Sequence, residues 1–330
     1  MKLLFGMGQY SDELTWDRVA DQFPGFEIAT CEPGEISANL DGVDVLSAFS
    51  GDAAMFRDHP QLSLLHQFGV GLDRIDIDAA TECGVWVARI PATGSGNGES
   101  VAELAILFML YLAKRVPQAL EALKERRWDQ PVGQSLLGKS ACILGAGEIG
   151  SLIAERLKPF GMKLIGVRAN PKNPRPTDAM FDSMYASGEL LEAVSTADFV
   201  VLSINYNASM RNMIDVSVIS AMKKGAVVIN IARGGLLDQD ALYQALLSGN
   251  LGGAGLDVFW EEPVDPDHPL LKLPNVIATP HIGGVTDTHF WLGAKVLGEN
   301  LGRYARGEAF DDLVNRPPKP RYSLSSAKAG

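Results

Sequence analysis

The sequence predicts an α/β protein built from two Rossmann-like, doubly wound parallel-sheet domains. Three observations support this prediction. The chain has 330 residues, whereas one domain has about 100 to 200, so two domains are expected. Short apolar runs alternate with polar, helix-like segments along most of the chain, as they do in α/β folds. In the second half these runs are almost continuously apolar, which is typical of parallel strands covered on both faces.

The first domain is expected over residues 1–100. Its apolar runs are Lys2 to Phe5, Val43 to Ala48 and Val85 to Val87. The glycine-rich loop from Pro91 to Gly98 follows, and we interpret it as a hinge. A long helix is predicted from Val101 past Leu123, with Ser100 as its cap and Glu103 at the third position. The start of this helix is apolar almost all round, so we expect protein to enclose it on several sides.

The second domain is expected over residues 101–284. Its predicted strands are Ala141–Leu144, Lys163–Val167, Phe199–Ser203, Ala226–Asn230, Gly255–Asp257 and Val276–Ala278. A last helix, from Thr286 to about Tyr304, is expected to pack back on the first domain, which then also takes in residues 285–330. The segment from Asn315 onward is predicted to be a loose tail because it ends in small polar residues.

The composition argues against several classes of function. The 40 acidic residues outnumber 29 basic ones, and the net charge of -11 leaves no positive field for nucleic acid. The longest apolar run, Leu104 to Ala113, is about half of the roughly 20 residues that span a bilayer, so no membrane partner is expected. The sequence has no C-x-x-C pair, no H-E-x-x-H motif and no signal-peptide pattern. We therefore expect no metal site and a cytoplasmic location.

The most informative motif is a glycine loop in the second domain. Gly145, Gly147 and Gly150 form the pattern G-x-G-x-x-G directly after an apolar strand and before a helical segment. The first glycine permits a tight turn, the second lets a pyrophosphate approach the backbone, and the third lets helix pack on strand. An isolated motif is also compatible with an empty turn, but this position predicts a dinucleotide site. We expect Glu148 to point into solvent, because pointing inward it would repel phosphate.

The residue after the next strand bears on the choice of dinucleotide. Such a unit normally has an acidic residue about 20 positions on, where it binds the adenosine ribose. The sequence instead has Arg168, eighteen residues past Gly150 (168 - 150 = 18). An arginine can stack on adenine and pair with a 2′-phosphate, which an aspartate would repel. We therefore prefer NADP(H) as the cofactor. The alternative is a surface arginine beside a pocket that also accepts NAD(H).

Three polar residues follow apolar strands of the same domain. Arg233 follows the strand Ala226–Asn230, Glu262 follows the next strand, and His281 lies in a glycine-flanked turn after the last one. Ligands of open α/β sheets bind at the carboxyl ends of the strands, so these side chains are expected to face the cofactor crevice. Each residue alone has a plain structural explanation, such as a capped histidine or a surface arginine. Their coincidence favours a catalytic site.

With these motifs the chain resembles the D-isomer-specific 2-hydroxyacid dehydrogenase family. The resemblance runs through the glycine loop and the segments Gly69–Asp76, Asn230–Gly235, Gly255–Pro263 and Thr279–Gly284. It implies a glyoxylate/hydroxypyruvate reductase-like activity, which transfers a hydride between NAD(P)H and a small 2-keto acid to give the D-2-hydroxy acid. It also implies an active-site cleft between the domains. A homodimer joined through the cofactor domain is a further implication, and it suits the enclosed helix.

The resemblance also implies roles for individual residues. Arg233 would bind the substrate carboxylate and polarise the keto group, His281 would be the acid/base, and Glu262 would be the partner of His281. Backbone amides around Val70 and Gly71 would share the substrate carboxylate. The implied cofactor contacts are Val101, Gly145, Gly147, Glu148, Ile149, Gly150, Arg168, Ser203, Ile231, Ala232, Arg233, Asp257, His281, Gly283 and Gly284.

The chemistry explains why these residue types are needed. Delivery of a hydride to a 2-keto acid leaves negative charge on the carbonyl oxygen, so a proton donor within hydrogen-bond reach lowers the barrier. A histidine supplies this donor, and a carboxylate such as Glu262 stabilises its protonated form. The planar guanidinium of Arg233 matches a carboxylate and fixes which face of the keto carbon is presented.

Two questions stay open from the sequence. Some relatives are dinucleotide-sensing transcriptional corepressors with the same catalytic-looking residues, and this binding function is the alternative. The substrate side chain is expected near Ser50, Gly51 and Val70, while Phe290 or Trp291 either lines the same pocket or serves as packing. Nothing in the sequence identifies the particular 2-hydroxy acid.

Overall fold

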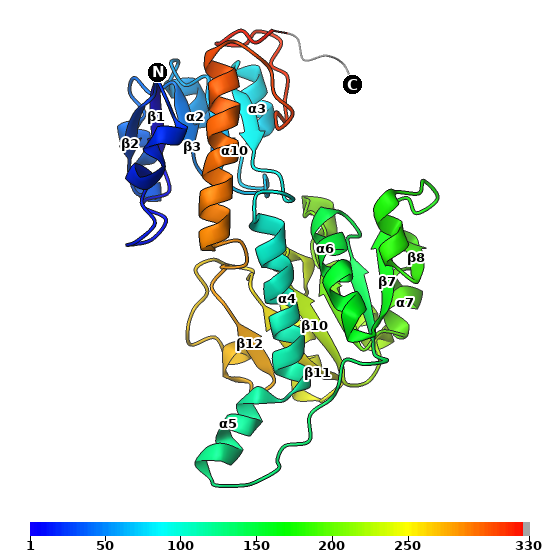
Figure 1. The fold of residues 1–330 in the computed structure, drawn as a ribbon. Helices are drawn as coiled ribbons and strands as arrows, with labels where there is room; N and C mark the ends of the chain where they lie inside the picture. The colour runs from blue at the N-terminus through cyan, green and yellow to red at the C-terminus, as the bar shows by residue number, and fades with distance from the viewer. Residues whose placement is uncertain (326–330) are drawn as a thin grey trace. The chain divides into compact units, whose positions relative to one another are not determined.

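The computed structural model describes residues 1–325, which form two compact units (Figure 1). The first unit combines residues 1–97 with 284–325, and the second is Gly98–Gly283. The chain leaves the first unit inside the glycine-rich segment and returns to it directly after Gly283. These divisions lie beside the boundaries at 100 and 285 that the sequence suggests.

The first unit contains a five-stranded parallel sheet in the order β2-β1-β3-β4-β5, which is the flavodoxin-like doubly wound order. Its strands are β1 (Lys2–Phe5), β2 (Glu27–Thr30), β3 (Val45–Ser47), β4 (Leu64–Gln67) and β5 (Trp86–Arg89). Its helices are α1 (Ile36–Asn39), α2 (Ala53–Asp58), α3 (Ile77–Glu82) and α10 (Asp287–Ala305), with 3₁₀ turns η1 (Trp16–Gln22) and η2 (Pro33–Glu35).

Helix α10 covers one face of the five-stranded sheet (Figure 1). It begins at a capping threonine, Thr286, whose hydroxyl accepts a hydrogen bond from the amide of His289. Its apolar stripe is fully buried with strand and loop side chains, and the members of this core include Phe5, Trp16, Phe68, Phe290, Leu297 and Tyr304. The burial of this stripe explains why a segment so late in the sequence belongs to the first unit.

The segment after Asn315 is not the loose tail that the sequence suggests, because it is docked as far as Ser325. The buried side chain of Asn315 accepts a hydrogen bond from the amide of Val87 at 2.7 Å and donates one to the carbonyl oxygen of Val85 at 2.9 Å. Arg321 donates hydrogen bonds to the carbonyl oxygens of Phe56, His59 and Leu62. Polar side chains therefore tie this segment to backbone groups. Residues 326–330 of the expected tail lie outside the described residues.

The second unit contains a seven-stranded parallel sheet in the order β12-β11-β10-β9-β6-β7-β8. Its strands are β6 (Ser140–Leu144), β7 (Lys163–Arg168), β8 (Ser183–Ala186), β9 (Phe199–Leu202), β10 (Ala226–Asn230), β11 (Leu251–Leu256) and β12 (Val276–Ala278). The order reverses between β6 and β9, which is the switch point where doubly wound sheets bind ligands. The predicted fold class is confirmed.

Helices and turns cover both faces of the second sheet, and the sheet separates two apolar cores, one on each face. The helices are α4 (Asn97–Ala113), α5 (Val116–Lys124), α6 (Glu148–Leu157), α7 (Leu190–Ser195), α8 (Val216–Ala221) and α9 (Gln239–Leu247). The 3₁₀ turns are η3 (Lys158–Phe160), η4 (Pro176–Met180), η5 (Ser187–Glu189), η6 (Ala208–Met210), η7 (Gly234–Leu236) and η8 (Pro269–Lys272).

The long helix predicted from Val101 past Leu123 is two helices, α4 and α5. Arg115 lies between them with a left-handed backbone, φ +54°, which ends the first helix. The predicted cap was also wrong, because α4 begins at Asn97 and Ser100 lies inside it. The hydroxyl of Ser95 instead accepts a hydrogen bond from the amide of Asn97 at 3.3 Å.

Candidate active site

The glycine loop joins β6 to α6 at the switch point of the second sheet. Gly145 has a φ of +103°, and a Cβ there would lie 2.7 Å from the backbone of Ile204. A Cβ on Gly150 would overlap the carbonyl oxygen of Gly145, so the third glycine is needed for the helix to approach the loop. Ser203, directly after β9, holds the glycine loop in place, because its hydroxyl donates to the carbonyl oxygen of Gly145 at 3.0 Å.

Gly147 differs from the other two glycines because, among residues 1–325, no atom beyond its own chain neighbours lies within 4 Å of the position of its missing Cβ. Gly147 is the N-cap of α6, and no side chain caps this helix end. The first amides of an α-helix have no partners inside the helix, so they are available to an anion. Open space beside uncapped amides fits the pyrophosphate of a dinucleotide. Glu148 is exposed to solvent, as the sequence suggests, while Ile149 is half-buried.

Arg168 is the last residue of β7, and residues of the following loop bind its guanidinium. The side chain is 8% exposed, and Nη2 donates to Oδ2 of Asp178 at 2.7 Å and to the carbonyl oxygen of Asn173. Oδ2 of Asp178 also accepts the amide of Arg175 at 2.8 Å. Among the described residues the Nε atom of Arg168 has no partner. The sequence did not reveal this acidic partner, because Asp178 follows Arg168 by ten residues with no recognisable pattern between them.

Arg233 follows β10 in a turn held by a buried asparagine. The side chain of Asn230 accepts the amide of Ala232 at 3.0 Å and donates to the carbonyl oxygen of Arg233 at 2.9 Å. Gly234 lets this turn lie directly against the next loop, because a Cβ there would overlap the backbone of Phe259. The side chain of Arg233 is half-buried, and Nη1 donates to the carbonyl oxygen of Ala232 at 2.7 Å.

Glu262 lies in the loop after β11, and the chain itself orients its carboxylate. Oε1 accepts a hydrogen bond from the amide of Phe259 at 3.0 Å, and Oε2 lies 2.9 Å from Nδ1 of His281. The side chain of Glu262 is 17% exposed, whereas that of His281 is 43% exposed. Because Nδ1 faces the carboxylate, Nε2 is the nitrogen left to meet a ligand.

His281 follows β12 in a strained turn that Asp257 holds. The φ of His281 is +56°, a left-handed conformation that residues other than glycine rarely adopt. The amide of His281 donates to the carbonyl oxygen of Asp257 at 2.8 Å. The carboxylate of Asp257 accepts Thr279 Oγ1 at 2.6 Å and the amides of Ile282 and Gly283, each at 2.8 Å. Burial raises the pKa of Asp257, although these hydrogen bonds oppose the rise.

The sheet topology explains how three distant segments contribute to one edge. Strands β10, β11 and β12 are adjacent and parallel, so Arg233, Glu262 and His281 all follow carboxyl ends at the same edge. The structure therefore pairs Glu262 with His281 and places Arg233 after a neighbouring strand. An imidazole whose one nitrogen faces a carboxylate can hold a proton on the other nitrogen.

The remaining residues expected at the site are distributed over both units. Ile231 and Ala232 are buried after β10, while Val101 lies on α4 and packs beside Gly283. In the first unit, Gly284 lies against the side chain of Asn97. Val70 and Gly71 are half-buried in the loop after β4, and Ser50 and Gly51 follow β3. Phe290 is a core residue, whereas Trp291 is 44% exposed.

Residues 1–325 also bear on membrane and metal binding. No helix in this range is both long and apolar enough to cross a membrane. Within the same range, no cluster of three or more histidine, cysteine, aspartate or glutamate side chains is arranged to hold a metal ion.

The fold and the glycine loop define a two-domain α/β protein with a Rossmann-type dinucleotide-binding domain. The family model described as "D-isomer specific 2-hydroxyacid dehydrogenase, NAD binding domain" matches residues 106–283, more than half of the chain. The chain therefore belongs to the D-isomer specific 2-hydroxyacid dehydrogenase family. The resemblance stated from the sequence is confirmed, and a nicotinamide dinucleotide is its cofactor class.

Two relatives and one solved structure show how far the similarity extends. A D-3-phosphoglycerate dehydrogenase of Methanocaldococcus jannaschii is 36% identical over 317 residues, 94% of this chain but 59% of the relative. A hydroxypyruvate reductase of Thermotoga maritima is 36% identical over 264 residues, 77% of this chain and 82% of the relative. An NADPH-dependent glyoxylate/hydroxypyruvate reductase of Sinorhizobium meliloti, solved with NADP and malonate, has a TM-score of 0.81, 27% identity and 99% coverage of both chains. The chain thus spans about three-fifths of the phosphoglycerate dehydrogenase.

Proposed function

We propose that this protein reduces a small 2-keto acid to the D-2-hydroxy acid with a nicotinamide dinucleotide, as glyoxylate and hydroxypyruvate reductases do. The observation that carries the proposal is the pair formed by His281 and Glu262 at the sheet edge of a dinucleotide-binding unit. The relatives reported above are named as enzymes, and this favours the reductase over the corepressor-type sensor.

In the proposed reaction His281 is the proton donor to the substrate. Its Nε2 protonates the carbonyl oxygen as negative charge develops there, and Glu262 orients the ring and stabilises the imidazolium. The guanidinium of Arg233 binds the substrate carboxylate and polarises the keto group. When bound, the reduced nicotinamide supplies the hydride. The turn held by Asp257 fixes where the imidazole lies.

For the cofactor, we propose that the glycine loop and the first turn of α6 hold the pyrophosphate. The free space at Gly147 and the uncapped helix start support this assignment. The residues implied by the family resemblance then surround the rest of the dinucleotide. Among them, Ser203 acts on the loop rather than through a free hydroxyl, because that hydroxyl is bonded to Gly145.

We propose that the preferred dinucleotide is NADP(H). Arg168 lies at the end of β7, where a ribose-binding acid is usual, and a 2′-phosphate would compete with Asp178 for its guanidinium. Replacing Asp178→Asn removes the competing charge and is expected to raise the ratio of kcat/KM for NADPH to that for NADH. The dissociation constants of NADPH and NADH, measured by fluorescence of the reduced nicotinamide, should show the same change in preference. The constant for NADPH should fall relative to that for NADH. Preference for NADH in the wild-type protein would overturn this assignment.

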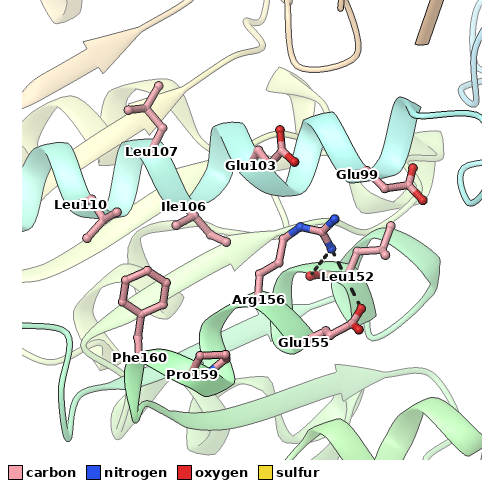
Figure 2. A pocket seen from close by; sticks show the side chains of 10 residues that line it. All are labelled: Glu99, Glu103, Ile106, Leu107, Leu110, Leu152, Glu155, Arg156, Pro159 and Phe160. Carbon is pink, nitrogen blue, oxygen red and sulfur yellow. Dashed lines mark hydrogen bonds and ion pairs between the residues drawn. The ribbon is translucent and has the colours of Figure 1, made fainter. Parts of the chain in front are cut away.

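We also propose that two copies pair through an apolar surface of the second unit. The second unit has an open groove of about 930 Å³. Its lining residues come from α4, α6 and η3 (Figure 2), namely Glu99, Glu103, Ile106, Leu107, Leu110, Leu152, Glu155, Arg156, Pro159 and Phe160. On α5 and the loop after it, large apolar side chains are 52% to 90% exposed, namely Leu120, Leu123, Trp128, Val132 and Leu137. Exposed apolar side chains that gather on one segment mark an interaction surface, which supports the pairing.

The mass in solution tests the pairing. Light scattering is expected to give a dimer for the wild-type protein and a monomer when Leu123→Glu and Trp128→Glu are combined. Val216→Glu, which changes an exposed apolar residue of α8, is the matched control and should leave the dimer intact. A monomeric wild-type protein would contradict the proposal.

We propose a cytoplasmic location for the protein. Cys31, Cys83 and Cys142 are all unpaired, and this suits a reducing compartment. Fractionation of the native host tests the location.

A panel of keto acids tests the reductase function itself. The purified chain is mixed with NADPH or NADH and with glyoxylate, hydroxypyruvate, pyruvate or phenylpyruvate, and the loss of absorbance of the reduced cofactor is followed. We expect turnover of at least one of the small acids, with the D-isomer as the product wherever the product is chiral. Tight cofactor binding without turnover of any of these acids would support the sensor instead.

A further inference from the structure

The loop after β4 has an unusual distribution of backbone hydrogen bonds. Four successive carbonyl oxygens, those of residues 69–72, all accept hydrogen bonds from within the first unit. Their donors are, in order, the amide of Ile90 at 3.1 Å, Nη1 of Arg89 at 3.3 Å, Nε2 of Gln67 at 2.6 Å and the amide of Ile75 at 3.0 Å. The carbonyl side of this loop is therefore fully occupied.

The amide side of the same loop is open. Among the described residues, the amides of Val70, Gly71 and Leu72 donate to no acceptor, although all three residues are half-buried. Backbone amides are obligatory hydrogen-bond donors, so three successive amides with no protein partner are open to a ligand. A row of amide donors is a site for an anion.

The two sides of the loop are linked through the peptide groups. In a trans peptide the carbonyl and the amide hydrogen point in opposite directions, so a bond that holds one also aims the other. Arg89 holds the carbonyl of the peptide whose amide belongs to Gly71. Gln67 holds the carbonyl of the peptide whose amide belongs to Leu72. Hydrogen bonds in such chains also polarise one another, so each amide becomes a better donor.

The position of Gln67 leaves one of its polar atoms buried without a hydrogen bond from residues 1–325, which is unfavourable for stability. The residue ends β4 and is 6% exposed, and its Oε1 is buried with no partner in the described part of the chain. A buried acceptor left unpaired is unfavourable, so the bond from Nε2 to Gly71 must offset it. Gly69 leaves the room for this carboxamide, because a Cβ there would lie 2.9 Å from Oε1.

We propose that Gln67 and Arg89 are positioning residues that aim the amides of Gly71 and Leu72 at the carboxylate of the substrate. This inference rests on the proposed function, in which the substrate is a 2-keto acid. It adds the amide of Leu72 to the carboxylate donors expected from Val70 and Gly71, and it assigns Gln67 and Arg89 a role in substrate affinity.

Two substitutions of Gln67 separate positioning from packing. Gln67→Met keeps the size of the side chain and removes the donor. We expect it to raise KM for glyoxylate about tenfold, the usual effect of one lost hydrogen bond near a charge. Both kcat and the dissociation constant of NADPH should stay within about threefold, because the cofactor is assigned to the other unit. A thermal midpoint close to that of the wild type shows that folding is unaffected.

Gln67→Glu is expected to make KM depend on pH, which a change in packing alone would not do. A carboxylate at this position repels both the carbonyl oxygen of Gly71 and the substrate anion, so KM should exceed that of Gln67→Met at pH 8. When the new carboxyl group is protonated it can donate to the same carbonyl, so the ratio of its KM to the wild-type KM should fall as pH is lowered. Gln61→Glu, at an exposed glutamine of the same unit, is the matched control and should show no such trend.

The role of Arg89 is tested by one substitution that removes its hydrogen-bond donor and a second that keeps a donor. Arg89→Met should raise KM for glyoxylate a few-fold, because its hydrogen bond to Val70 is longer than that of Gln67 to Gly71. Arg89→Lys keeps a charged donor and should recover part of the loss. The inference is overturned if wild-type protein reduces keto acids and both Gln67 variants keep the wild-type KM. Absence of keto-acid reduction by the wild type would instead overturn the proposed function, and the inference with it.

Discussion

Nδ1 of His281 lies 2.9 Å from Oε2 of Glu262, and the other oxygen of this carboxylate accepts the amide of Phe259 at 3.0 Å. A backbone amide therefore holds the same carboxylate that orients the imidazole. Because Nδ1 is engaged, Nε2 is the ring nitrogen that remains for the proposed substrate. The proposed proton transfer therefore depends on this pair and not on the histidine alone.

The role of the carboxylate predicts the effect of Glu262→Gln. The amide keeps the shape of the side chain but removes the charge that stabilises the imidazolium, so kcat for keto-acid reduction should fall about 10- to 100-fold. Steady-state kinetics with saturating NADPH measure the change. Glu261→Gln alters the exposed neighbouring residue and serves as the control. Equal activity of the two variants would show that Glu262 does not support the histidine.

The role of Arg233 predicts a difference between alanine and lysine at this position. Arg233→Ala removes the planar fork that matches a carboxylate and should raise KM for glyoxylate by about 100-fold or more. Arg233→Lys retains the charge but not the fork and should recover only a small part of the loss. Arg211→Ala, at an exposed arginine of the same unit, should have no effect. Full recovery by lysine would mean that charge alone, without geometry, is sufficient.

The glycine loop predicts opposite outcomes for two similar substitutions. Gly147→Ala adds a methyl group where the protein has free space, so stability should be unchanged while NADPH binding weakens at least tenfold. Gly150→Ala places the same methyl group on the carbonyl oxygen of Gly145, so it should lower the thermal midpoint of the protein. Thermal unfolding and fluorescence titration with NADPH separate the two effects. Unchanged NADPH affinity in Gly147→Ala would argue that the pyrophosphate binds elsewhere.

The buried histidine of the first unit predicts a pH dependence of stability. Complete burial lowers the pKa of His66 from 6.5 to about 4, against the opposing effect of the hydrogen bond to the carbonyl oxygen of Gln67. Between these values the unfolded chain binds more protons than the folded chain. Stability therefore falls as pH decreases from 6.5 toward 4, by at most about 3 kcal/mol. Above 6.5 this contribution to stability is fully present.

Urea unfolding at pH 7 and pH 5 measures this dependence. His66→Gln removes the titrating group, so the difference between the two pH values should become smaller than in the wild type. A difference of the same size in both proteins would show that other groups control the acid sensitivity of the fold.

The sequence predicted those parts of the protein that local patterns determine. The glycine loop, the strand ends bearing Arg233 and His281, and the start of the last helix near Thr286 all follow from residues close together in the chain. Apolar runs located most strands of the second sheet. Strands β2, β4 and β8 were missed, because β2 and β8 are only partly buried and β4 ends in the polar residues His66 and Gln67.

Features that depend on distant partners could not be predicted. The ion pair of Arg168 with Asp178 crosses a loop without a recognisable motif. The docking of Asn315 depends on backbone groups of β5 more than 200 residues earlier. Gln67 acquires its importance from a carbonyl that only the folded loop turns toward it. In each case a polar side chain forms a hydrogen bond with a group that no local sequence pattern identifies as its partner.

The most direct test of the proposed chemistry is a single-turnover measurement on His281→Ala. The variant is loaded with NADPH and mixed with glyoxylate, and oxidation of the cofactor is followed by absorbance beside a separate titration of NADPH binding. We predict a rate at least about 1000-fold below that of the wild-type protein, with NADPH affinity changed only modestly. A rate near that of the wild type would contradict the assignment of His281 as proton donor.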